Sequence, residues 1–403
     1  MERLAKLPPC PFSEEVAREL LAIYGSPLYV YDRDILCQTI QHITKSIPYP
    51  QTQFHFASVT NGNVALLQIF RQEGWGLHAN TPGDIYLGMQ AGFSCDRIIY
   101  SGSNLNRDEM EQLLIWGIKT LNFDSIAQVK LYCEIYQNSQ FPIPNLGLRL
   151  NLPSLTGDSR IGVRPEEFAD AIAITKQAGL KLTGLHFYRG TGTNATTAFT
   201  SAIDTVLATA QTLPDWEYLD FGGGFGYPYQ HDGVAFDWEL FGIELTNSIA
   251  KIRKEIKLII EPGRAAIAKC ATLLAKVVSV KWQAEKQIVG IDTTVANLSV
   301  PAVHGGYREI TTWNTNKIYL TDVCGNTTYS RDYLGKNCPL PRLEIGDMIA
   351  ILDVGAYGYA MSSHFLHRPK PAEVLLENGK HRLIRKREDY SVLLANQVFD
   401  GRE

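Results

Sequence analysis

Eight short apolar segments, each followed by a helical pattern, constrain the fold of this chain more than any other feature. The segments have the length of buried strands, and several of the helical stretches between them end in glycine, a common helix C-cap. Eight such units over about 230 residues match the size and order of a (β/α)8 barrel, an α/β fold. The expected strands cover residues 53–58, 76–80, 97–102, 119–124, 146–151, 182–188, 217–224 and 257–264.

After residue 264 the pattern changes to β-branched runs separated by turns, which is typical of a mostly antiparallel β-domain. A further apolar strand at 28–32 precedes the barrel pattern, and we expect it to join that sheet. We therefore expect an N-terminal segment over 1–35 that contributes to the β-domain, a barrel over 36–264 and a C-terminal β-domain over 265–403.

Composition and charge exclude several classes of function. The 403 residues carry a net charge of −4, which provides no basic surface for nucleic acid or for an anionic membrane. The seven cysteines are scattered without CxxC spacing, so neither a disulfide framework nor a zinc cluster is expected. The chain start has no apolar signal-peptide core, and no run reaches the length of a membrane helix. We expect a cytoplasmic protein that binds a small molecule and, because no ligand set of His, Asp and Glu is spaced on one face, no metal.

Polar side chains gather where the expected strands end, which is the edge that carries the chemistry of such a barrel. No lysine ends a strand, because Lys119 and Lys257 begin theirs and so lie at the opposite edge. The polar residues at the strand ends are Ser58, His78, Asn80, Ser101, Ser103, Asp124, Arg149, Asn151, His186, Tyr188, Arg189, Glu261 and Arg264.

Two of these strand ends suggest a phosphate site. The glycines of "DFGGGFG" (220–226) let backbone N–H groups come close to a phosphate, although a tight strand-to-helix turn would explain them equally well. Arg264 in "EPGR" (261–264) suits bidentate pairing with phosphate, and a structural ion pair is the alternative.

The order of several motifs carries a resemblance to a known family. The motifs are "SPLYVYD", "LHFYRGTG", "LDFGGGFGYPY", "IIEPGR", "LTDVCG", "GDMIAILDVGAYGYAMSS" and "RPKPAEVLL". Together they resemble the alanine-racemase-fold amino-acid decarboxylases that use pyridoxal 5′-phosphate (PLP), such as diaminopimelate, ornithine and arginine decarboxylases. The resemblance covers about residues 26–395. It implies a (β/α)8 barrel with a C-terminal β-domain and a head-to-tail homodimer.

The resemblance also implies site residues. Glu261 would face the pyridine nitrogen and hold the ring protonated, so that the ring acts as an electron sink. Arg149 falls on a site position of the family, and Cys324 would lie on a loop that reaches the partner subunit's site. The phosphate site would comprise Thr191, Gly222, Gly223, Gly224, Arg264 and Tyr357.

This chain departs from the family at the residue that anchors the cofactor. The family lysine lies in a segment like Y-A-V-K-A-N-x-N, and the matching "FASVTNGN" (56–63) places Val59 at the lysine position. An alkyl side chain cannot form a covalent bond with the cofactor aldehyde or return a proton after carbon dioxide leaves. Shifting the register recovers only Ser58 or Thr60.

Other departures surround the expected ring. His78 stands where the family has an acid, and Tyr188 stands where a histidine stacks on the ring. The acid that follows the family cysteine is missing, with Thr328 its nearest counterpart unless an insertion brings Asp332 there. Two carboxylates and a lysine are replaced while Arg189 and His78 are added, so we expect a pocket richer in cations, which favours an anionic ligand.

Three functions are compatible with this pattern. The first is a lyase-like enzyme of altered chemistry on an amino-acid-like or phosphate-bearing ligand, with PLP bound non-covalently if it binds at all. His78, Tyr188, Arg189 and Cys324 are its candidate catalytic residues, since histidine or tyrosine can replace lysine as a proton donor. The second is a catalytically silent ligand-binding or regulatory protein. The third is an ordinary PLP-dependent amino-acid decarboxylase.

Overall fold

The structure is a computed structural model that describes residues 7–137, 141–190, 192–230, 232–252, 254–300 and 302–398. The chain divides into two compact units. The barrel unit comprises Cys37–Tyr227 and Val234–Ala266, and the β-unit comprises Met1–Leu36, Pro228–Gly233 and Ile267–Glu403. Each unit is described by itself.

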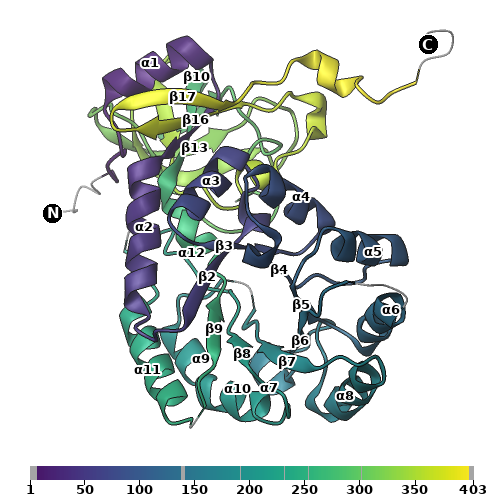
Figure 1. Ribbon diagram of the computed structural model, residues 1–403. Coiled ribbons are helices and arrows are strands. Elements are labelled where there is room, and N and C mark those ends of the chain that lie inside the picture. The colour runs from purple at the N-terminus through teal and green to yellow at the C-terminus, as the bar shows by residue number, and fades with distance from the viewer. Residues whose placement is uncertain are drawn as a thin grey trace. The chain divides into compact units, whose positions relative to one another are not determined.

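The barrel unit contains a closed barrel of eight parallel strands, as the sequence predicts (Figure 1). Each strand pairs with the next, and the last strand pairs with the first, with Phe54 opposite Ile260. Parallel closure brings the carboxyl ends of all eight strands to one edge. The strands are β2 (Thr52–Ala57), β3 (Gly76–Ala79), β4 (Ile98–Tyr100), β5 (Thr120–Phe123), β6 (Asn145–Arg149), β7 (Leu182–His186), β8 (Tyr218–Asp220) and β9 (Lys257–Ile260).

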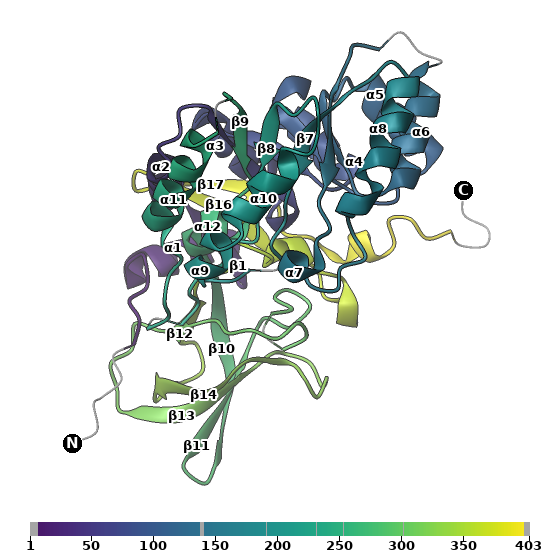
Figure 2. The same ribbon diagram turned by 90° about the horizontal axis from the view of Figure 1, so that it is seen from below.

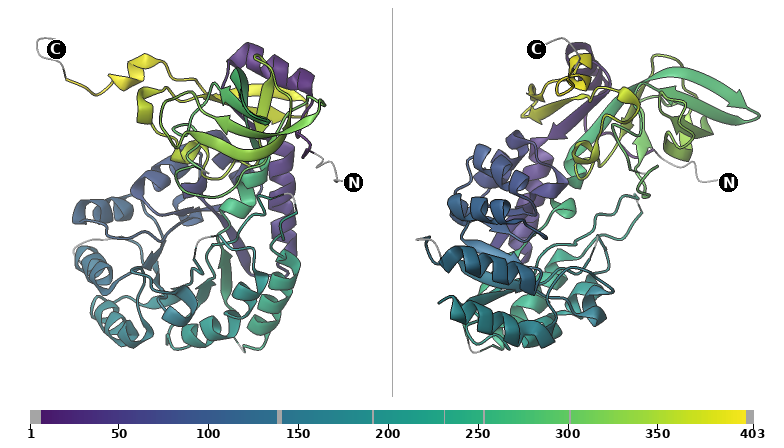
Figure 3. Two further views of the ribbon diagram at one scale, coloured as in Figure 1. Left: turned by 180° about the vertical axis from the view of Figure 1, so that it is seen from behind. Right: turned by 90° about the vertical axis from the view of Figure 1, so that its right-hand side faces the viewer.

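Helices cover the outside of the barrel strands (Figure 3). Local sequence starts them: the Asn63 side chain caps α3, and Thr81 with Asp84 forms a capping box at α4. Their apolar faces bury residues such as Leu66 and Phe70. The helices are α2 (Arg33–Ser46), α3 (Val64–Gln72), α4 (Pro82–Gln90), α5 (Arg107–Ile115), α6 (Ile126–Gln137), α7 (Pro153–Thr156), α8 (Phe168–Gln177), α9 (Thr196–Thr200), α10 (Ile203–Ala210), α11 (Trp238–Ala250) and α12 (Arg264–Ile267).

The barrel interior combines one large side chain with two glycines. Tyr218 on β8 is buried, and a Cβ added at Gly184 on β7 would lie 1.8 Å from its Cζ. A Cβ at Gly147 on β6 would lie 2.4 Å from the Tyr218 hydroxyl oxygen. The ring therefore fits only because both positions lack a side chain. Its hydroxyl donates a 2.8 Å hydrogen bond to Asn122 Oδ1, which satisfies both buried groups.

The β-unit is built on a nine-stranded, mostly antiparallel sheet (Figure 2). The predicted N-terminal strand joins it: β1 (Leu28–Asp32) pairs antiparallel with β10 and parallel with β16. A helix, α1 (Glu14–Tyr24), packs its apolar side, including Leu20, against this sheet. The other strands are β10 (Ala271–Gln283), β11 (Lys286–Ile291), β12 (Ile310–Thr311), β13 (Ile318–Cys324), β14 (Tyr333–Pro341), β15 (Met348–Ile351), β16 (Ala372–Glu377) and β17 (Lys380–Arg385). Among the described residues, no helix has the length and apolar character needed to span a bilayer.

The packing of Tyr218 predicts a cost for one added methyl group. Gly184→Ala should lower the free energy of unfolding by about 1–3 kcal/mol, because the new Cβ overlaps the ring. Gly83→Ala is the matched control, since its Cβ would meet only the Thr81 hydroxyl oxygen at 3.6 Å. Thermal or urea unfolding of both variants measures the difference. Equal stability of the two variants would contradict this account of the barrel interior.

Candidate active site

The strand expected to carry the family lysine ends in a short 3-10 turn, Ser58–Thr60, directly after β2. Ser58 is buried and donates to the carbonyl of His78, and Thr60 is buried and donates to the carbonyl of Ala57. Val59 is 45% exposed, although valine is usually buried. Neither neighbour can replace the lysine, because both hydroxyls are directed into the protein. The unpacked side chain at this strand end is therefore an alkyl group.

The glycine stretch after β8 has the backbone geometry of a cradle. Gly222 and Gly224 have φ of +66° and +101°, where a side chain is strained, and a Cβ at Gly223 would lie 2.5 Å from the carbonyl oxygen of Glu261. The N–H of Glu261 donates to the carbonyl of Gly222 at 2.8 Å. Because the peptide group is planar and trans, the N–H of Gly223 points the opposite way, away from Glu261. These positions suit a phosphate, and the phosphate site stays a prediction.

Arg264 lies beside a second glycine loop of the barrel unit. A Cβ at Gly192 would lie 2.9 Å from Arg264 Nε, so the arginine side chain packs closely against the "RGTG" turn. Thr193 in the same loop donates its N–H to the carbonyl of Gly224 at 3.1 Å. The fold thus brings Arg264, this loop and the glycine cradle together. Thr191, the remaining predicted phosphate residue of this loop, lies outside the described residues.

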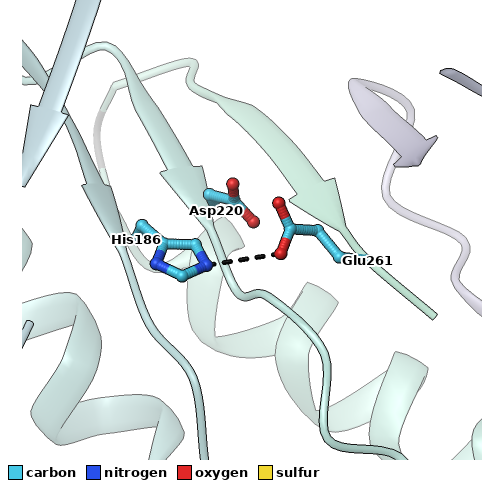
Figure 4. A group of neighbouring side chains, drawn as sticks. All are labelled: His186, Asp220 and Glu261. Carbon is cyan, nitrogen blue, oxygen red and sulfur yellow. Dashed lines mark hydrogen bonds and ion pairs between the residues drawn. The ribbon is translucent and has the colours of Figure 1, made fainter. Parts of the chain in front are cut away.

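Three buried titratable side chains come together from neighbouring strands, and Figure 4 shows them pointing toward one another. His186 ends β7, Asp220 ends β8, and Glu261 follows β9. Each has at most 2% of its surface exposed. His186 Nε2 lies 3.3 Å from Glu261 Oε2, within hydrogen-bond distance. Glu261 Oε1 is buried without a hydrogen-bond partner among the described residues, so one carboxylate oxygen remains for a ligand.

Burial determines the protonation of this group. It raises the pKa of Glu261 to about 7, an effect opposed by a hydrogen bond from Asp220 and by the Arg149 charge. Burial, together with the nearby Glu261 charge, raises the pKa of Asp220 well above its ordinary value. Burial lowers the pKa of His186 to about 4. Burial thus favours the protonated form of Asp220 and the neutral form of His186, and Glu261 has a pKa near neutral pH.

Asp220 connects this group to the glycine cradle. Its Oδ1 accepts the N–H of Gly222 at 3.0 Å, and its Oδ2 accepts from Asn122 Nδ2 at 3.0 Å. Asp220, Asn122 and Tyr218 are not among the site residues that the sequence motifs predict. A buried polar residue inside an apolar strand, such as Asn122 within 119–124, was the available signal.

His78, which stands in place of the family acid, is also buried beside Glu261. Its Nε2 lies 3.6 Å from Glu261 Oε1, which is longer than a hydrogen bond, and neither ring nitrogen has a hydrogen-bond partner among the described residues. Burial lowers the pKa of His78 well below its ordinary value, and the neighbouring His186 and Arg149 lower it further. His78 is therefore neutral at pH 7. It brings a polar group to the site but no positive charge.

Arg149, Tyr188 and Arg189 lie at the ends of β6 and β7. Arg149 Cζ lies 5.1 Å from the centre of the Tyr188 ring, a cation–π contact. A Cβ at Gly224 would lie 3.6 Å from Tyr188 Cε2, so this ring also borders the cradle. Arg189 Nε donates to the carbonyl of Ala198, which uses one edge of its guanidinium within the fold. Arg149 and Tyr188 thus lie with the glycines, as expected, and Arg189 is partly engaged elsewhere.

Two predicted site residues, Cys324 and Tyr357, belong to the β-unit. Cys324 ends β13, and burial raises the pKa of its thiol, which keeps it protonated near neutral pH. Tyr357 has φ of +59°, an unusual backbone conformation for tyrosine. Asp332 is 3% exposed and accepts hydrogen bonds from Thr294 and Thr327 and from the backbone N–H of Val295. The Asp332 carboxylate is therefore hydrogen-bonded within the β-unit. This argues against the interpretation that it replaces the acid that follows the family cysteine.

The ligand atoms of His186, Asp220 and Glu261 all lie within 4.8 Å of one another, close enough to surround a small cation. The expectation of no metal rested on spacing along the sequence, which cannot detect a group assembled from three strands. It stays a prediction. The hydrogen bonds already described give the three side chains another use, the sharing of protons.

The raised pKa of Glu261 predicts a pH-dependent stability. Its ordinary value is 4.5, so between about pH 4.5 and 7 the folded protein holds a proton that the unfolded chain releases. Because of Glu261, the free energy of unfolding should therefore fall by up to about 3 kcal/mol as the pH rises from 4.5 to 7. Buried neutral histidines act in the opposite sense, but wild type and Glu261→Gln share them. The difference between the two unfolding curves, measured from pH 4.5 to 8, should decrease as pH rises; a constant difference would contradict the prediction.

Comparisons with known proteins identify relatives of this chain. Residues 34–268 match the family model described as "Pyridoxal-dependent decarboxylase, pyridoxal binding domain". The chain is 32% identical to a diaminopimelate decarboxylase of Methanothermobacter thermautotrophicus, over 96% of this chain and 95% of that protein. It is 29% identical to a diaminopimelate decarboxylase of Neisseria meningitidis serogroup B, over 96% of this chain and 97% of that protein.

Solved structures agree with the sequence comparisons. The crystal structure of diaminopimelate decarboxylase from Helicobacter pylori complexed with L-lysine has a TM-score of 0.87 and 27% identity, and the alignment covers 94% of this chain and 98% of that one. A lysine/ornithine decarboxylase from Vibrio vulnificus complexed with putrescine, with a TM-score of 0.81 and 20% identity over 92% and 100% of the two chains, shares the fold. The family model covers more than half of the chain, and the resemblance in motifs is confirmed. This chain belongs to the pyridoxal-dependent decarboxylase family of the alanine-racemase fold.

Proposed function

We propose that this protein binds a pyridoxal-phosphate-type ligand without a covalent bond to its own side chains and acts as a lyase-like enzyme of altered mechanism. The observation that carries the proposal is the exposed Val59 at the end of β2, in the same unit as an undistorted glycine cradle. A phosphate can be held by such a cradle, whereas an alkyl side chain offers no amine to an aldehyde.

The residues of the barrel unit fit two parts of PLP and not the third. Gly223, Gly224 and Arg264 suit the phosphate, and the buried, unpartnered Oε1 of Glu261 suits a protonated ring nitrogen. The aldehyde has no lysine partner among the described strand ends of the barrel. A ligand that already carries its amine, such as a preformed adduct of PLP with an amino compound, avoids that difficulty.

When bound, the pyridinium ring would supply an electron sink for bond cleavage next to the amine. Glu261 would hold the ring nitrogen through its free oxygen, and His186 and Asp220 would keep that carboxylate in place. The roles of proton donors fall to Tyr188 and His78, because both lie at the strand ends and neither is committed to a side-chain hydrogen bond in the described part of the chain. Arg189 and Cys324 remain weaker candidates for catalysis.

The relatives are named diaminopimelate decarboxylases, and this supports an amino-acid-like substrate. It also keeps open an ordinary PLP-dependent decarboxylase. A catalytically silent ligand-binding protein is favoured by one observation: His78 and His186 are both buried and neutral near pH 7, so neither imidazole carries the extra proton that a lysine ammonium would donate. We further propose, on family resemblance, a head-to-tail homodimer in which Cys324 and Tyr357 serve the site, and a cytoplasmic location.

Restoring the lysine provides the direct test. Val59→Lys, incubated with PLP, should acquire a visible absorption band that borohydride abolishes while attaching the pyridoxyl group to residue 59, since the new amine follows a barrel strand at the same edge as the cradle. Wild type and Val59→Met, which has a comparable side-chain length without an amine, should show no attachment by peptide mass spectrometry. Borohydride-stable attachment of a pyridoxyl group to wild type would contradict the proposal and favour the ordinary decarboxylase.

The phosphate assignment has its own test. Arg264→Gln should weaken binding of PLP by about 10-fold or more, because a charge-assisted hydrogen bond is lost. Binding of pyridoxal, which has no phosphate, should be unchanged, and Arg107→Gln on the exposed surface of α5 serves as the control. Equal PLP affinity in the Arg264 variant and wild type, measured by fluorescence or calorimetric titration, would remove Arg264 from the site.

A further inference from the structure

The guanidinium of Arg149 is partly buried but makes no ion pair with the residues that the structure describes, which is unusual for a cation. Within the described part of the chain it also has no hydrogen bond, and its Cζ lies 5.1 Å from the centre of the Tyr188 ring. Burial lowers the pKa of Arg149, an effect opposed by the more distant charges of Glu261 and Asp124. Arginine remains charged in proteins, so a cation in this position needs an anionic partner.

Each nearby carboxyl group has at least one oxygen in a hydrogen bond to another residue, and none makes an ion pair with Arg149 within the described part of the chain. Glu261 Oε2 lies against His186, and Asp220 accepts from Gly222 and Asn122. Asp124 Oδ2 accepts a short hydrogen bond from the Ser103 hydroxyl. These acids therefore act on Arg149 through space, without direct contact.

His78 explains why no closer acid is present. By resemblance, the end of β3 carries an acid in this family, and here it carries a neutral imidazole. The exchange removes one negative charge from the neighbourhood of Arg149, whose charge acts on His78. Because Glu261 would be paired with the ring nitrogen of a bound ligand, less negative charge would remain to balance Arg149, on which Asp124 also acts from a distance.

The position of Arg149 suits a second anionic group on the same ligand. Arg149 on β6 lies opposite His186 on β7 in the strand register. His186 in turn lies close to the glycine cradle, because a Cβ added at Gly222 would lie 3.3 Å from its Nε2. Tyr188 contacts the guanidinium and also borders Gly224. A guanidinium packed on an aromatic ring keeps its N–H edge available, and this edge matches the two oxygens of a carboxylate.

We infer that Arg149 binds a carboxylate of the ligand, and that His78 makes it available for this by replacing an acid. The inference rests on the proposed function and narrows its ligand class: a phosphate-bearing pyridoxyl compound that retains a carboxylate, such as an adduct with an amino acid. Arg149 is then a residue that determines specificity, and the product of decarboxylation would bind more weakly than the substrate.

Two stable ligands separate this inference from the proposed function. N-phosphopyridoxyl-alanine and N-phosphopyridoxyl-ethylamine share the phosphate, the ring and a reduced carbon–nitrogen bond, and they differ only in the carboxylate. Wild type should bind the alanine compound at least about 10-fold more tightly by calorimetry, as expected for a charge-assisted pair. Arg149→Gln should lose this preference while its affinity for the ethylamine compound stays within a few-fold of wild type.

A second variant leaves Arg149 in place. His78→Asp supplies an internal carboxylate for Arg149 and should also reduce the preference for the alanine compound, whereas His78→Asn, which is uncharged, should preserve it. Circular dichroism and thermal melts confirm that each variant is folded.

The outcomes are distinguishable. Equal affinity of wild type for the two compounds would overturn the inference and leave the proposed function standing. An unchanged preference in both Arg149→Gln and His78→Asp would also overturn it. If wild type binds neither compound, the proposed function fails and the inference fails with it.

Discussion

The contact between His186 and Glu261 is the interaction on which the rest of the site depends. It holds one oxygen of a buried carboxyl group and leaves the other for a ligand. Asp220 is hydrogen-bonded to the same carboxyl group. Its Oδ1 also accepts the N–H of Gly222, which holds the start of the glycine cradle in place. The ring end and the phosphate end of the pocket are therefore linked by one buried residue. Such a network is costly to disrupt, because each group left unpaired in the barrel interior would lack solvent.

This network does not include position 59, which by resemblance is the lysine position of the family. Val59 is an exposed alkyl group, yet the buried neighbours Ser58 and Thr60 keep their hydrogen bonds and the turn retains its form. Since position 59 contributes little to packing, a change there alters the chemistry without unfolding the barrel. By resemblance, His78 replaces an acid of the family. This replacement differs from that at position 59, because it removes a negative charge from the barrel interior. Within the described part of the chain, Arg149 makes no ion pair, and the neutral His78 beside the site adds no negative charge to it.

Much of the fold was predictable because it follows from local patterns. Eight apolar strands with helices between them require a closed parallel sheet, and the β-branched runs after residue 264, joined by the strand at 28–32, require a second sheet. The glycines after β8 were recognisable because only glycine accepts their backbone angles. The site was predictable only in part. Asp220 and Asn122 could not be predicted from the sequence because their contacts are with other strands, and the burial of Asp332 cannot be inferred from spacing along the chain.

The sequence by itself determined the barrel, its second sheet, the glycine cradle and the absence of an amine at position 59. Each of these depends on residue type and local order along the chain. Only the tertiary structure decided that Glu261 titrates near neutral pH, that His78 and His186 are neutral, and that Arg149 makes no ion pair with the residues that the structure describes. These properties depend on distance and on exclusion of water between side chains from different strands. They arise from the closure of the barrel, which brings residues distant in sequence into one region of low dielectric constant.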